Sequence, residues 1–154
     1  MLKSTVILGN FIPIIYRCTS LNQISKVASV YRVQTMATGS NIPIVDVDPS
    51  GVFKYILLNV YDKQKDAANP QMVIVRGYKH CNYHSDIYDE VQAKLSPLDC
   101  EPLGGGRISH DPENKKIHIY GYSQGYGKAD HEITAKLIKN AFPAFTITIS
   151  DEGY

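Results

Sequence analysis

Residues 72–95, MVIVRGYKHCNYHSDIYDEVQAKL, constrain the fold most, because they join a strand pattern to a helix pattern in one short stretch. The apolar run Val73–Tyr78 predicts a buried strand, which a polar loop follows. Ser85 is a good helix N-cap with acidic residues after it, so we expect a helix that begins directly after His84 and ends before Pro97. Apolar residues at helical spacing give this helix one buried face: Ile87, Val91 and Leu95.

His84 is a candidate functional residue because of its place at the start of the predicted helix. A helix N-terminus leaves backbone N–H groups without intrahelical partners, so it attracts anions and biases an imidazole toward its neutral form. A neutral imidazole can act as a base or as a nucleophile. The more common meaning of the pattern is a surface histidine beside a helix cap that does no chemistry.

The composition is that of an ordinary one-domain globular chain. It has 154 residues, 44% of them hydrophobic and 20% charged, and its formal charge of +1 argues against a nucleic-acid binder. No apolar run is long enough to span a membrane. Three cysteines without paired spacing favour a reducing compartment. His80, Cys81 and His84 lie close together, but no second ligand pair at zinc-like spacing follows, so no metal site is expected.

Residues 1–41 differ in composition from the rest. Four basic residues and no acid precede Asp46, so the first 45 residues carry a charge of +4. This pattern fits a mitochondrial targeting segment or a disordered extension, and fits a secretory signal less well. Met36 offers a second start that would omit the leader. We expect a leader over 1–41 and a folded domain over 42–154, which is cytoplasmic unless the leader directs it to mitochondria.

Patterns after the leader predict about six strands and two main helices. Val52–Tyr61 is apolar nearly throughout, which predicts a central strand and makes the charge of Lys54 notable. The order of elements predicts an α+β domain, with the helices packed on a mixed β-sheet. Further strands are expected at Ile44–Val47, Val73–Tyr78, Lys116–Tyr122 and Phe145–Ile149, and the second helix is expected to bury Ile133, Leu137, Ile138 and Ala141.

Two glycine-containing segments invite closer attention. Asp99–Ser109 contains three successive glycines, which mark a bulge or a close approach by a backbone or ligand; a turn between two short strands is the simpler interpretation.

Residues 123–127, like the loop that ends at His84, connect a strand to a helix. If both loops open at one sheet edge, an anion-binding nest can form from the N–H groups of Ser123, Gln124 and Gly125. Lys54, Arg76 and Arg107 can add positive charge, although a salt bridge or a solvated face explains each alone.

Several motifs, in this order, resemble the janus/phosphohistidine phosphatase family. They are DVD at 46–48 with GVFKY, IVRGY with Tyr83-His84 and DIYD, LGGGRISH, KKIHIYGYS and a closing DEGY, and they cover about Ile44 to Tyr154. The resemblance implies a six-stranded mixed sheet and a small phosphatase that needs no metal or other cofactor. Its implied substrates are histidine-phosphorylated proteins, with phospholysine as a further substrate. We expect a monomer without nucleic-acid or membrane partners.

The same resemblance implies roles for particular residues. His84 is the catalytic general base or nucleophile, and Lys54 contacts the substrate. Arg76, Arg107 and His110 are expected to support the site or dock the substrate. The alternative is a regulatory protein that binds a phosphorylated partner in somatic sex differentiation. The implied phosphate-binding loop is Ser123, Gln124 and Gly125, of which the last two depart from the family's common residues.

Overall fold

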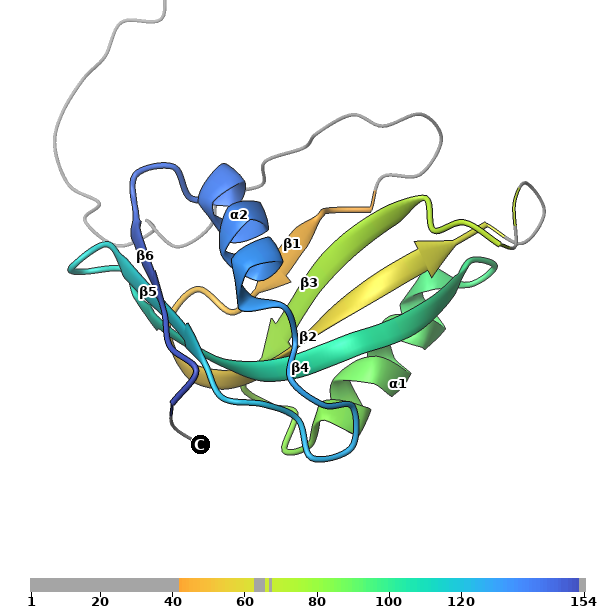
Figure 1. Cartoon of the computed structure of the whole chain (residues 1–154), viewed down its shortest axis with the longest axis horizontal. Coiled ribbons are helices and arrows are strands. Elements are labelled where there is room, and N and C mark those ends of the chain that lie inside the picture. The colour runs from red at the N-terminus through yellow and green to blue at the C-terminus, as the bar shows by residue number, and fades with distance from the viewer. Residues whose placement is uncertain (1–41, 63–65, 67, 153–154) are drawn as a thin grey trace, which may run out of the picture. The chain divides into compact units, whose positions relative to one another are not determined.

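We describe the fold from a computed structural model, which covers residues 42–62, 66 and 68–152. The expected leader and the second start at Met36 lie outside these residues. All of the described residues belong to one compact unit. Neither helix in the described part of the chain is long and apolar enough to cross a membrane. The elements are β1 (Val45–Val47), β2 (Gly51–Tyr61), β3 (Met72–Tyr78), α1 (His84–Leu95), β4 (Asp99–Asp111), β5 (Lys116–Tyr120), α2 (His131–Ala141) and β6 (Thr146–Ile149) (Figure 1).

The six strands form one mixed sheet in the order β1-β3-β2-β4-β5-β6. β2 pairs antiparallel with β3 and β4, and β4 pairs antiparallel with β5. The two outer pairs, β1 with β3 and β5 with β6, are parallel. The expected α+β fold, with a six-stranded mixed sheet and two helices, is confirmed. The central place of β2 explains its near-continuous apolar sequence.

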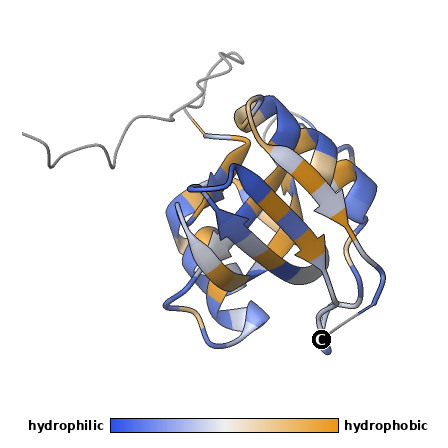
Figure 2. Cartoon of the chain, turned by 90° about the vertical axis from the view of Figure 1, so that its left-hand side faces the viewer, coloured by the Kyte–Doolittle hydropathy of each residue, from blue (hydrophilic) through white to orange (hydrophobic). Residues whose placement is uncertain are grey.

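The two helices cover opposite faces of the sheet (Figure 1). Side chains alternate along β2, so Tyr55 joins the core beneath α2 with Ile138, whereas Ile56 joins the core beneath α1 with Ile87. On the side that faces the viewer in Figure 2, hydrophobic and hydrophilic residues alternate along the strands. Lys54 shares the parity of Ile56 and therefore lies on the α1 face.

β4 runs through its three glycines as one strand, so the interpretation of two short strands joined by a turn is wrong. The close approach is confirmed, and it differs for each glycine. A Cβ on Gly104 would lie 2.6 Å from the backbone of the loop before α2, and one on Gly105 would lie 2.6 Å from the His84 ring. A Cβ on Gly106 would lie 2.8 Å from the Tyr55 ring. The glycines therefore let a loop and two rings pack directly on the strand.

α2 packs on the sheet partly through polar side chains. Its buried residues are His131, Thr134 and Ile138. Ile133 was expected to be buried but is 43% exposed, because the polar residues take the inner face. The Tyr55 hydroxyl donates to Nδ1 of His131 over 2.7 Å, and Nε2 of His131 donates to the Gly121 carbonyl over 3.0 Å. These bonds satisfy the buried imidazole.

Three buried histidines make the fold sensitive to acid. Burial lowers the pKa values of His84, His110 and His131 from the ordinary value of 6.5. Below about pH 6.5 the unfolded chain binds protons that the folded protein does not, so the free energy of unfolding should fall as the pH drops. Urea denaturation between about pH 7.5 and about pH 5 measures this. The fall should be smaller in His110→Leu, and a wild-type stability that stays constant would contradict the prediction.

Candidate active site

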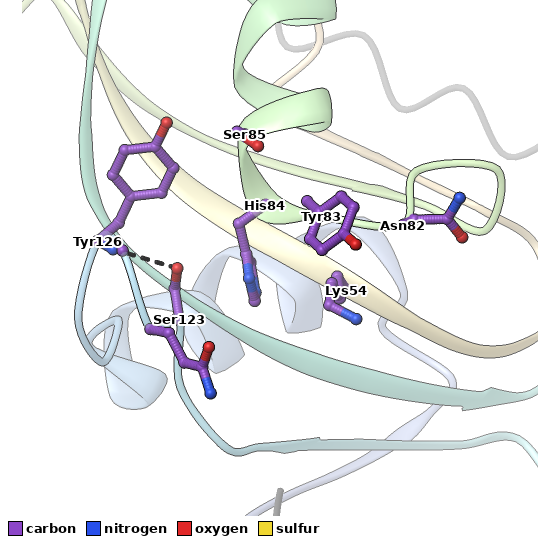
Figure 3. A pocket seen from close by; sticks show the side chains of 9 residues that line it. Lys54, Asn82, Tyr83, His84, Ser85, Ser123 and Tyr126 are labelled. Carbon is purple, nitrogen blue, oxygen red and sulfur yellow. Dashed lines mark hydrogen bonds between the residues drawn. The ribbon is translucent and has the colours of Figure 1, made fainter.

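An open pocket of about 390 Å³ lies where the start of α1 meets β2 and the loop after β5. Figure 3 shows the His84 ring pointing into it, between Ser123 and Lys54. The structure thus brings together all five residues to which the sequence assigned catalysis or substrate binding. The lining residues are Lys54, Asn82, Tyr83, His84, Ser85, Ser123, Gln124, Gly125 and Tyr126.

His84 is the first residue of α1, whose N-cap is Tyr83 and not Ser85 as expected. The cap is closed by the Asp86 carboxylate, which accepts a hydrogen bond of 2.8 Å from the backbone N–H of Tyr83. Ser85 therefore lies in the first helical turn and at the pocket wall. This start of the helix directs the His84 ring toward β4.

One hydrogen bond sets the tautomer of His84. Its Nε2 lies 3.0 Å from the carbonyl oxygen of Gly106, and a carbonyl can only accept, so Nε2 of the neutral ring carries the proton. The ring edge at Cδ2 and Nε2 packs against Gly105. Nδ1 therefore keeps its lone pair and faces away from β4.

The surroundings of His84 favour its neutral form. Burial lowers the pKa of its imidazole most, and the positive charges of Lys54 and Arg107 lower it further. The hydrogen bond to Gly106 opposes this change and raises the pKa. The net direction is downward, so the ring is neutral at physiological pH and Nδ1 can accept a proton or attack an electrophile.

The loop of residues 123–127 is placed beside His84 by β4. The N–H of Gly105 donates to the carbonyl of Gly127 over 3.0 Å, so the loop pairs with β4 beyond the end of β5. The loop also closes on itself, because Ser123 and Gly127 exchange hydrogen bonds of 3.1 and 2.9 Å. The Ser123 hydroxyl oxygen accepts from the N–H of Tyr126 over 3.2 Å (Figure 3).

These bonds change the composition of the expected anion nest. The backbone N–H of Ser123 is used within the loop, so Ser123 can serve a ligand through its hydroxyl group only. Within the described residues, the N–H groups of Gln124 and Gly125 have no acceptor in the protein. Across the pocket, the N–H groups of His84 and Ser85 belong to the first helical turn and lack intrahelical acceptors.

The pocket is electropositive. No acidic residue is among those that line it, and within the described part of the chain no carboxylate pairs with Lys54. Arg107 is the neighbour of Lys54 in the β2–β4 register and lies on the same sheet face. An ammonium group, backbone N–H groups and a hydroxyl that converge in this way are complementary to a tetrahedral oxyanion such as a phosphoryl group.

Arg76, Arg107 and His110 were expected to support the site or dock the substrate, but none of them lines the pocket. Arg107 lies beside Lys54, whereas Arg76 and His110 are held elsewhere. The Arg76 guanidinium donates to the carbonyl groups of Pro43, Ile44 and Val75 and so joins the segment before β1 to β3. His110 lies on the α2 face, where its Nδ1 donates to the Asp48 carbonyl and its ring packs against Phe142 and Phe145. Their positions favour structural roles.

Arg76→Ala should therefore destabilise the fold and leave catalysis intact. Three carbonyl groups lose a charged donor, so we expect the free energy of unfolding to fall by roughly 2–4 kcal/mol. Urea denaturation measures this, and Arg76→Lys should recover a part of the loss. A folded Arg76→Ala protein with strongly reduced kcat would instead place Arg76 in the chemistry.

The structure adds four residues to the site that the sequence had not assigned to it. Asn82, Tyr83 and Ser85 are chain neighbours of His84, so their position next to it was the available signal. Tyr126 follows the predicted nest by one residue and belongs to the same closed loop. Tyr83 is 68% exposed at the rim, where it can contact a bound protein.

The fold and the pocket define a small α+β protein with an oxyanion pocket built around a neutral histidine. Residues 39–146 match the Janus/Ocnus family, and the chain belongs to this family. It is 49% identical over 119 residues to the 14 kDa phosphohistidine phosphatase of Sus scrofa, a match that covers 75% of this chain and 94% of the relative. Identity to the 14 kDa phosphohistidine phosphatase of Homo sapiens is 48% over 117 residues, covering 73% and 94%. Identity to the sex-regulated protein janus-A of Drosophila melanogaster is 44% over 118 residues, covering 75% and 84%.

Proposed function

We propose that this protein is a phosphohistidine phosphatase, which hydrolyses the P–N bond of phosphohistidine in proteins without a metal ion. The observation that carries the proposal is the His84 ring, whose unprotonated Nδ1 stands in a pocket of hydrogen-bond donors and positive charge. The names of the Sus scrofa and Homo sapiens relatives support the same reaction here.

Positioning and charge neutralisation can supply most of the catalysis, because the phosphoramidate P–N bond is already a high-energy linkage. Lys54, the N–H groups of Gln124 and Gly125, and the Ser123 hydroxyl hold the phosphoryl oxygens. Nδ1 of His84 then either takes a proton from the water that attacks phosphorus or attacks phosphorus itself. In the first route the proton that His84 took from water passes to the substrate imidazole, which leaves as the P–N bond breaks. In the second route the P–N bond breaks as Nδ1 binds phosphorus, the leaving imidazole takes a proton from solvent, and water later hydrolyses phosphorylated His84.

Phosphate release by the full chain, with a chelator present, tests this function. The substrates are one protein phosphorylated on histidine and the same protein phosphorylated on serine. We expect turnover of the phosphohistidine and little release from the phosphoserine, because the pocket holds no acidic side chain to protonate an alcohol leaving group. Absence of release from both proteins, or loss of activity with the chelator, would contradict the proposal.

A regulatory phosphoprotein binder is the second candidate, and the name janus-A of the Drosophila melanogaster relative favours it. Such a protein would use the same oxyanion pocket and could act in sex differentiation. It has no need of an unprotonated Nδ1 on His84, which favours the enzyme. Binding of the phosphohistidine protein without turnover would select the binder.

We further infer that histidine-phosphorylated proteins are the partners, and that the protein acts as a monomer in the cytoplasm. The free thiols of Cys81 and Cys100 support a reducing compartment. The domain limits 42–154, the mitochondrial leader and the second start at Met36 stay predictions. Mass spectrometry of the native N-termini tests the last two.

A further inference from the structure

A second cluster of reactive side chains lies outside the pocket, where the loop after β3 meets α1. His80 and Cys81 come from the loop and Glu90 from the helix. Oε2 of Glu90 lies 2.7 Å from Nε2 of His80 and 3.8 Å from Sγ of Cys81, and the three ligand atoms all lie within 4.8 Å of one another. None of the three residues lines the pocket, and the proposed reaction does not use them.

We propose that His80, Cys81 and Glu90 bind one divalent transition-metal ion of the zinc class. Imidazole, thiolate and carboxylate are zinc ligands, with bond lengths of about 2.0–2.3 Å. Tetrahedral geometry places such ligand atoms about 3.3–3.6 Å apart. Binding therefore requires the 2.7 Å contact between His80 and Glu90 to widen, and Sγ of Cys81 to move closer than its present 3.8 Å from Glu90. The His80 side chain is 64% exposed, which leaves the fourth position open to water.

Neighbouring groups already orient the three ligands. The His80 ring stacks on Tyr78, with centroids 5.4 Å apart and planes inclined by 16°. Lys94 binds Oε1 of Glu90, so that Oε2 can bind the ion while Oε1 keeps its partner. Cys81 is 7% exposed within the core beneath α1, which limits the motion of its sulfur. Support of this kind raises the affinity of a metal site.

The charge and proton balance of binding is simple. The Cys81 thiol releases its proton to solvent, and the thiolate together with the Glu90 carboxylate offsets the two positive charges of the ion. His80 binds through Nε2, so the proton of its neutral ring moves to Nδ1. No oxidant or other reactant is needed.

The sequence groups His80 and Cys81 with His84, but the structure replaces the third member. His84 turns toward Gly106 of β4, and Glu90 takes its place beside Cys81. An ion at this site would join His80 and Cys81, which precede His84 in the loop, to Glu90 of α1. It would thus stabilise the segment that positions His84 without entering the pocket.

Cobalt serves as the spectroscopic probe, with the full chain in reduced form. We expect one equivalent of Co²⁺ to produce thiolate-to-cobalt charge-transfer absorption in the near ultraviolet, and Zn²⁺ to displace it. Cys81→Ser should lose this absorption. His80→Ala, a change of an exposed residue that should not affect folding, should bind at least about tenfold more weakly. Cys100→Ser, which removes the other described cysteine, is the matched control and should keep the absorption.

Three results would overturn the site. The first is no charge-transfer absorption in the wild type, and the second is absorption that survives in Cys81→Ser, which would assign it to another thiol. The third is equal affinity of the wild type and His80→Ala. Phosphatase activity is measured separately with a chelator present and should persist there. Failure of the metal site and failure of the proposed phosphatase are therefore distinguishable.

Discussion

Replacement of His84 by alanine should lower kcat for phosphohistidine hydrolysis by about 10²- to 10⁴-fold, the range for loss of a general base. The variant removes Nδ1, which is the unprotonated nitrogen of the ring and faces away from β4. Lys54 and the loop of residues 123–127 remain, so binding of the phosphoprotein should change much less than kcat. Phosphate release at saturating substrate, together with a binding titration, measures the two effects.

His110→Asn is the matched control for this variant. His110 is also a buried histidine bonded to a carbonyl, but it lies on the other face of the sheet. Its Nδ1–H group can be replaced by the asparagine amide, so kcat should stay close to wild type. Added imidazole should restore part of the His84→Ala activity if the loss is chemical. A His84→Ala protein with near wild-type kcat would remove His84 from the mechanism.

Gly105→Ala should reduce both stability and activity, because its new methyl group occupies the place of the His84 ring. The Cβ atom would lie 2.6 Å from Cδ2 of His84 and 2.9 Å from the backbone oxygen of Tyr55. We expect a loss of roughly 1–3 kcal/mol in the free energy of unfolding. Displacement of the ring should lower kcat by about 10²-fold. Urea denaturation and kinetics under conditions where the protein is folded separate the two effects.

Ile138→Val provides a control that lowers stability on the other side of the sheet. Ile138 belongs to α2 and is fully buried against the sheet, and the loss of one methyl group there should cost about 0.5–1.5 kcal/mol without moving His84. Its kcat should therefore match the wild type. If Gly105→Ala also keeps the wild-type kcat, the contact between Gly105 and His84 does not position the ring for catalysis.

Local sequence patterns predict much of this fold, because the type of an element and its buried face often depend on the spacing of apolar residues within that element. The apolar run of β2 predicts a central strand, and the helical spacing of Ile87, Val91 and Leu95 predicts the buried face of α1. The place of His84 at a helix start is also a local property. The cap itself is Tyr83, because the Asp86 carboxylate closes the turn two residues farther back than a Ser85 cap would require.

Contacts between distant segments are the part that such patterns do not carry. His131 is buried because of a hydrogen bond to Tyr55, 76 residues away, and this partner displaces Ile133 from the inner face of α2. The three glycines of β4 likewise depend on rings and a loop that reach them from elsewhere. The motifs that resemble the family indicate which residues form the pocket. Which hydrogen-bond donors of the pocket are free for a ligand follows only from the closed loop of residues 123–127.

The most direct test of the mechanism is the protonation state of His84 at neutral pH. Long-range ¹H–¹⁵N correlation spectra of the labelled full chain report the tautomer of each histidine, and His84→Ala assigns the signal. We predict a neutral ring protonated at Nε2, with a pKa below the ordinary value of 6.5. A charged ring at neutral pH, or a ring protonated at Nδ1, would contradict the proposed role of His84.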